Sequence, residues 1–178
     1  MFQRAVHAVL VRVAFLPCLL SACTPALDWR EVRLPDSQLK LLMPCKPVRQ
    51  ERRISLAGQE MPWTLHVCSA DGVSWAVGTA SLQDPAKIPR TLAALAEAAQ
   101  ANLGSGVGTT SKLHVPGATV YDGQVRRQLK GQRSDGAGIE MQLAVFARGL
   151  QVYQVSVLAA ALPEEAAETF IGSLRFLP

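Results

Sequence analysis

The chain is poor in the residues that most hydrolytic and redox enzymes use. Its 178 residues include three histidines and four cysteines. No two cysteines form C-x-x-C, so a thiol-exchange enzyme is not indicated. A Ser-His-Asp hydrolase would need His66 or His114 near a serine on a strand-to-helix turn. Ser74 lies in the nearest match to G-x-S-x-G, which lacks the last glycine and falls in a predicted β-meander. We therefore interpret Ser74 as an ordinary strand residue.

Two further catalytic or phosphate-binding motifs are incomplete. Ser37-Gln38-Leu39-Lys40 matches S-x-x-K of penicillin-binding enzymes, but neither S-D-N nor K-T-G follows. The glycine-rich stretch 104–108 precedes Lys112 at the wrong spacing for a phosphate-binding loop, and a predicted helix comes before it. We expect no catalytic residues, no cofactor and no metal, and interpret the chain as non-enzymatic.

The chain also lacks an apolar run of about 20 residues, which a helix needs to span a bilayer. Its N-terminal segment has basic residues at Arg4 and Arg12, no acid before Asp28, and an almost wholly apolar stretch over 13–22. A basic start, a short apolar stretch and small residues before a cleavage site are typical of a secretory signal. We predict a cleaved signal peptide over residues 1–22.

The end of this segment, Leu20-Ser21-Ala22-Cys23, resembles the lipobox of bacterial lipoproteins. In that family the cysteine sulfur receives a diacylglycerol, a peptidase cleaves before the cysteine, and the new amino terminus is usually acylated. Each buried methylene of such chains contributes roughly 0.8 kcal/mol, and two or three chains give stable anchoring. The resemblance implies that lipid on Cys23 anchors the mature chain to a membrane. An ordinary signal peptide followed by a chance cysteine is the alternative.

The residue after Cys23 is Thr24. In the resembling Gram-negative lipoproteins an aspartate at this position favours the inner membrane. The resemblance therefore implies anchoring in the outer membrane, facing the periplasm, with the inner membrane as the alternative. Export argues against nucleic acid as a partner. Without Arg4 and Arg12 the chain has 16 basic and 14 acidic residues, so its charge is only a weak argument for an anionic partner.

Two cysteines, Cys45 and Cys68, remain in the folded part after processing, because Cys18 leaves with the signal. In an oxidising compartment such a pair is most simply a disulfide, worth about 3 kcal/mol on the chain-entropy model. The competing interpretation is a metal site with His66 as a third ligand, but no plausible fourth ligand is found. Two unpaired thiols are the remaining alternative.

Hydrophobic periodicity predicts one α+β domain over residues 37–178, preceded by a lipidated tether over 23–36. Asp71-Gly72 predicts a hairpin turn. Pro89 and Gly104 bracket a predicted helix, and 163–172 forms a second. Strands are expected near 39–43, 61–67, 73–77, 119–133, 139–145, 153–157 and 174–176, with 49–56 alternating poorly.

This order of elements favours an antiparallel β-sheet covered by two helices. From Leu39 to Phe176 it resembles the PsbP/DcrB-like α/β sandwich, and the closing stretch 166–176 looks like the family's terminal helix and strand. That family is mostly non-enzymatic and functionally diverse. The resemblance therefore implies a fold and carries over no catalytic residues.

Basic residues gather in two groups. Arg126, Arg127, Lys130 and Arg133 form one, and Arg49, Arg52 and Arg53 form the other. As strand residues, Arg126 and Lys130 share one face while Arg127 and Arg133 share the other. A solvated sheet surface explains this pattern. Contact with anionic headgroups or an acidic envelope partner is the functional alternative.

Two non-enzymatic functions fit these observations. The first is an accessory for envelope assembly or binding, with an envelope protein or lipid as partner. The second is a module for a small ligand or lipid, which would lie between helix and sheet among Trp63, Trp75, Leu95 and Leu103. A hydrolase of unrecognised type is the least favoured.

Overall fold

The computed structural model describes residues 27–35, 37–104 and 108–177. The predicted signal peptide and the lipobox with Cys23 lie outside these residues. Neither helix of the described chain combines the length and apolar character that crossing a bilayer requires.

The strands form two antiparallel sheets rather than the single sheet expected. The smaller has the order β1-β2-β10, with β1 (Arg30–Arg33), β2 (Leu39–Met43) and β10 (Arg175–Phe176). Residues 30–33 fall within the expected tether, whose sequence combines prolines with mixed charges. They form a strand nevertheless, since β2 offers a pairing edge and Trp29 packs against the buried core.

The larger sheet has seven strands in the order β3-β4-β5-β9-β8-β7-β6. Every neighbouring pair in it is antiparallel. Its strands are β3 (Val48–Leu56), β4 (Gln59–Ala70), β5 (Val73–Ser81), β6 (Thr109–Ser111), β7 (Val125–Gln132), β8 (Gly138–Arg148) and β9 (Gln151–Ala159).

The hairpin predicted at Asp71-Gly72 is present, with positive φ angles of 52° and 72° at the two residues. A two-residue hairpin turn of this kind needs both central residues in that region. The strand expected over 119–133 is shorter and begins only at Val125. The chain before it turns at Gly123, which also has positive φ.

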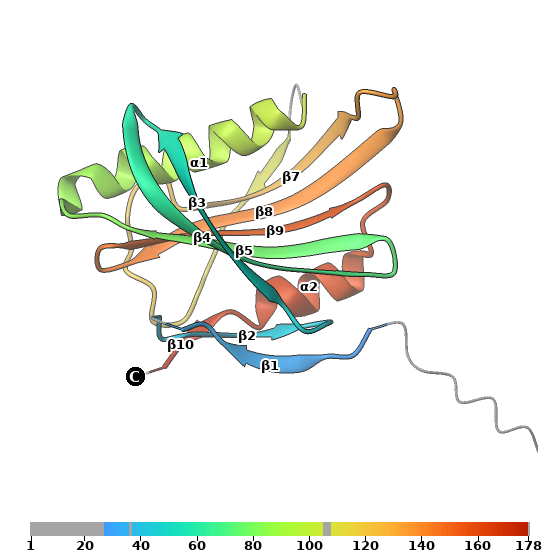
Figure 1. Cartoon of the computed structure of the whole chain (residues 1–178), viewed down its shortest axis with the longest axis horizontal. Helices are drawn as coiled ribbons and strands as arrows, with labels where there is room; N and C mark the ends of the chain where they lie inside the picture. The colour runs from blue at the N-terminus through green and yellow to red at the C-terminus, as the bar shows by residue number, and fades with distance from the viewer. Residues whose placement is uncertain (1–26, 36, 105–107, 178) are drawn as a thin grey trace, which may run out of the picture.

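Both predicted helices are present: α1 (Ile88–Asn102), preceded by a 3-10 turn (Pro85–Lys87), and α2 (Glu164–Gly172). Helix α1 covers one face of the large sheet, while α2 and the small sheet lie on the other (Figure 1). The α+β class with helices covering an antiparallel sheet is therefore confirmed.

Each face of the large sheet has its own buried core. The core under α1 includes Leu92, Leu95 and Leu143. The opposite core is rich in aromatic side chains, among them Trp75 and Phe170, whose ring centroids are 5.3 Å apart in an edge-on contact.

Helix α1 approaches the chain beneath it so closely that its two ends lie over glycines. A methyl group added at Gly123 would come within 2.9 Å of the Pro89 carbonyl oxygen. One added at Gly131 in β7 would overlap the Leu103 carbonyl oxygen and lie 2.8 Å from Leu103 Cγ. Side-chain-free positions at both ends thus fix how near the helix lies to the sheet.

Candidate functional site

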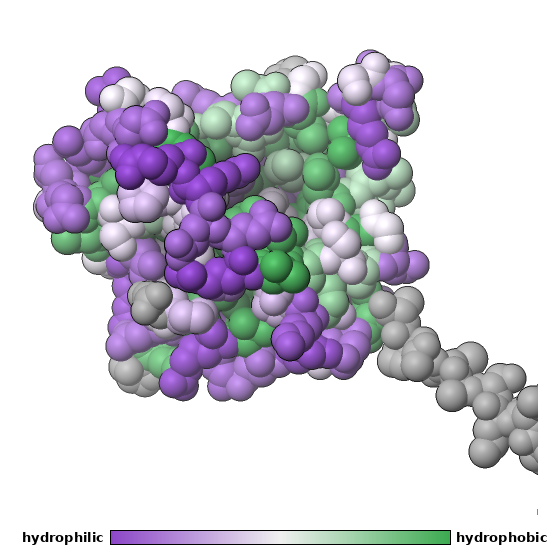
Figure 2. Space-filling model, in the orientation of Figure 1, coloured by the Kyte–Doolittle hydropathy of each residue, from purple (hydrophilic) through white to green (hydrophobic). Residues whose placement is uncertain are grey.

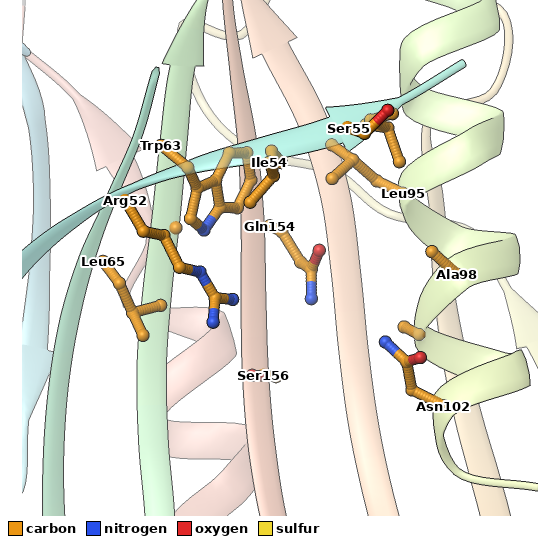
Figure 3. Close-up of a pocket in the computed structure, with 13 residues that line it drawn as sticks. Arg52, Ile54, Ser55, Trp63, Leu65, Leu95, Ala98, Asn102, Gln154 and Ser156 are labelled. Atoms are coloured by element: carbon orange, nitrogen blue, oxygen red, sulfur yellow. The ribbon is translucent and has the colours of Figure 1, made fainter. Parts of the chain in front are cut away.

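A groove of about 280 Å³ lies between α1 and the β3–β4 hairpin, with β5 and β9 as its floor (Figure 3). Strand β3 is an edge strand and most of its residues are exposed. Hydrophilic side chains gather over this strand where it crosses the front of the molecule (Figure 2). The groove therefore lies behind a polar edge, and its apolar lining comes from residues such as Ile54, Leu65 and Ala98.

Five polar residues from three elements line the groove, and one of them, Ser55, lies on the face of β3 opposite to Arg52. Arg52 comes from β3, Gln154 and Ser156 from β9, and Asn102 from the last turn of α1. Figure 3 shows Arg52, Gln154 and Asn102 pointing into the same space. Among the residues that line the groove in the described part of the chain, Arg52 alone carries a charge. Besides Ser55, the site thus offers one guanidinium, two amides and a hydroxyl.

Gln154 and Ser156 are unusual for their position. They alternate along β9 with the buried Tyr153, Val155 and Val157, and β9 is a central strand between β5 and β8. The face of a central strand that lies under a helix is normally apolar. Both side chains are half-buried, and neither forms a side-chain hydrogen bond with a described residue. Their hydrogen-bonding groups are therefore available to a ligand.

Trp63 forms the inner wall of the groove and lies directly opposite Arg52 in the β3–β4 pairing. Its indole rests on Gly78 of β5, where an added methyl group would overlap Cζ2 and lie 2.7 Å from Nε1. Because β5 has no side chain at this point, the indole can lie against the sheet and leave the groove open.

Of the four residues predicted to line a ligand space, Trp63 and Leu95 do so. Leu103 belongs to the same core but does not line the groove. Trp75 was placed wrongly, because it lies in the core on the opposite face of the sheet. The two-residue turn pairs Cys68 with Trp75, so Trp75 shares a face with Cys68 and not with Trp63.

The disulfide between Cys45 and Cys68 is confirmed, with Cα atoms 5.9 Å apart. It links the segment after β2 to β4. The metal alternative is not supported, because no group of three or more His, Cys, Asp or Glu side chains suited to a metal occurs among the described residues. His66, two residues before Cys68 on the same face of β4, is buried. Desolvation, and secondarily the charge of Arg49, lowers its pKa.

The four basic residues in and just after β7 do not lie together. Arg126 faces α2 and binds Glu168, with Nη1–Oε2 at 3.1 Å, while Lys130 binds Glu140 at 2.8 Å. These hydrogen bonds lower the pKa of both carboxyl groups and raise that of Lys130. Ion pairing thus neutralises this face of the strand.

The other two basic residues lie elsewhere. Arg127 points to the α1 side, where it donates a hydrogen bond to Gln100, and Arg133 lies in the turn after β7. The four do not form one surface.

The incomplete catalytic motifs are not assembled into a site. The Ser74 hydroxyl lies 3.4 Å from that of Ser69. Ser37 accepts hydrogen bonds from the Leu39 amide and the Tyr153 hydroxyl, whereas Lys40 pairs with Glu31. Of the other residues considered for these motifs, His114 and Lys112 are exposed. The glycine-rich stretch 104–108 lies partly outside the described residues.

Sequence reasoning recognised Arg52 only as one of three neighbouring arginines, and it missed Gln154, Ser156 and Asn102. The available signal was the polar alternation on β9 within an otherwise apolar strand. Comparison with known proteins adds no further assignment: no family model matches the chain, and no curated protein matches it.

Proposed function

We propose that this chain is a lipid-anchored binding protein of the bacterial cell envelope, and that it holds a small ligand in the groove between α1 and the β3–β4 hairpin. The observation that carries this proposal is that the side chains of Arg52, Gln154, Ser156 and Asn102 line one groove of about 280 Å³. Small-ligand sites typically combine apolar walls with a few oriented polar groups. The role is one of binding and carries no catalytic step.

The proposed anchor is lipid on Cys23, and Thr24 favours the outer membrane with the domain in the periplasm. Only three residues lie between Cys23 and Leu27, where the described chain begins, so the two are four positions apart. Extended chain spans at most about 3.5 Å per residue, so the domain would be held within about 14 Å of its anchor. The binding site would therefore work close to the membrane surface.

The fold proposed is the PsbP/DcrB-like sandwich. Its support is the order of elements: antiparallel strands, a helix, three long strands, then a helix and a short closing strand. The strands are split into two sheets, and the first and last described strands lie together in the smaller one. Comparing this split with solved structures of that fold would test the assignment.

Two experiments test this function. Cys23→Ser should move the protein from the membrane to the soluble periplasmic fraction, and an unchanged fractionation would contradict the anchor. Native mass spectrometry of the mature chain, purified from membranes in detergent, should show a bound small molecule. Ala98→Phe fills the groove from the half-exposed side of α1 and should remove that mass. Equal occupancy in the two proteins would contradict the groove as the site.

A further inference from the structure

The polarity of the groove identifies the chemical class of its ligand. One end carries the guanidinium of Arg52, and the residues lining the groove include no acid. Arg53, the next residue, has Glu60 as a neighbour across the strands, with Nε–Oε2 at 3.9 Å. Arg52 has no ion-pair partner among the described residues. A guanidinium with an open fork is the side chain best suited to bind a carboxylate through two parallel hydrogen bonds.

The other end of the groove disfavours a doubly charged ligand. Asn102 lies in the last turn of α1, and the carboxyl end of a helix carries partial negative charge. A phosphate dianion would meet a single cation at Arg52 and this unfavourable field at the far end. A monoanion with hydrogen-bond donors at its other end fits both ends of the groove.

The floor of the groove disfavours a plain hydrocarbon tail. Gln154 and Ser156 present an amide and a hydroxyl to the space, and an alkyl chain would bury both without partners. Leaving such groups unpaired costs about 1–3 kcal/mol each. A ligand with amide or hydroxyl groups satisfies them, while Ile54, Leu65 and Ala98 contact its apolar atoms.

We propose that the groove binds a small carboxylate whose neighbouring atoms carry amide or hydroxyl groups. Arg52 binds the carboxylate, and the side chains of Gln154, Ser156 and Asn102 hydrogen bond to the rest of the ligand. A short peptide with a free carboxyl terminus and a sugar acid both carry this chemistry. This assignment rests on the proposed function, because it concerns the same groove.

The test uses the full mature chain in detergent and calorimetric titration with matched probes. Acetyl-alanyl-alanine is compared with its carboxyl-terminal amide, glucuronate with methyl glucoside, and octanoate serves as the apolar carboxylate. At least one of the two free acids should bind about 10-fold or more tightly than its neutral counterpart, and more tightly than octanoate. Whichever acid binds more tightly identifies the source.

Variants localise the binding. Arg52→Ala should weaken binding of the preferred acid by about 10-fold to 100-fold, the range for a hydrogen bond to a charged group. Arg52→Lys should recover only part, since a lysine lacks the fork. Arg53→Ala is the matched control. It removes the same charge one residue away, on the opposite face of β3, and should bind like the parent protein. Circular dichroism confirms that each variant is folded.

The results distinguish a failure of the carboxylate assignment from a failure of the groove as the binding site. Equal binding of acids and neutral counterparts, tighter binding of octanoate, or equal effects of Arg52→Ala and Arg53→Ala would overturn the carboxylate assignment. If a bound molecule is still lost from Ala98→Phe, the groove remains the binding site for another class. If no probe binds and Ala98→Phe changes nothing, both are wrong.

Discussion

Replacing Gly131 with alanine should push the carboxyl end of α1 away from the sheet. The new methyl group would overlap the Leu103 carbonyl oxygen and lie 2.8 Å from Leu103 Cγ. Backbone cannot rotate aside as a side chain can, so the last turn of the helix must move. Overpacking of a well-filled core costs typically 1–3 kcal/mol, and a backbone clash belongs at the upper end. We expect a loss of about 3 kcal/mol in the free energy of unfolding.

Gly138 provides the matched control, because it lies in the same β7–β8 hairpin and nothing lies within 4 Å of an added methyl group. Its replacement by alanine should change stability by less than about 0.5 kcal/mol, as exposed substitutions do. For a chain of this length, 3 kcal/mol corresponds to a fall in Tm of about 6–12 °C.

Thermal and urea unfolding followed by tryptophan fluorescence would measure the difference. Gly131→Ala should also weaken binding in the groove, since Asn102 lies on the turn that moves. Equal stability of the two alanine variants would refute the idea that α1 is held at a distance set by backbone contact.

Reducing the Cys45–Cys68 bond with a dithiol should lower the free energy of unfolding by about 3 kcal/mol in urea, and an unchanged midpoint would contradict this. Burial lowers the pKa of His66, so the unfolded chain binds the proton first. The contribution of neutral His66 to the free energy of unfolding should be fully present above about pH 6.5 and should be lost as the pH decreases towards the folded pKa. His66→Leu should flatten this pH dependence. An alanine at Gly78 should displace the Trp63 indole into the groove and weaken binding at least about 10-fold, since overpacking costs typically 1–3 kcal/mol; unaltered affinity would show that the indole has room elsewhere.

The elements with strong local signals were predictable from sequence. Period-two patterning located β4 and β5, and Pro89 and Gly104 located α1, because local backbone preferences and tertiary packing agree there. Strand β1 was missed because only Val32 among its four residues is apolar. It forms a strand because it pairs with the edge of β2, which its own sequence does not indicate.

The error over Trp75 has a different origin. Both β4 and β5 have buried side chains on each of their two faces, so hydrophobicity alone does not say which residues share a face. The two-residue turn at Asp71-Gly72 would have decided it, because it pairs Ala70 with Val73 and hence Cys68 with Trp75. The groove could not be predicted from the sequence, because it depends on how the β3–β4 hairpin and α1 lie over the same sheet.

The meeting of β10 with β2 sets the order in which this fold can close. Arg175 pairs with Lys40, so the small sheet unites residues from opposite ends of the chain. Until β10 pairs with β2, the small sheet lacks one of its strands, and the core formed by the inward-facing Leu39, Leu41 and Met43 is incomplete. This core is therefore closed by contacts between segments far apart in the sequence, and such long-range pairing is slow to form because the loop-closure entropy must be overcome first.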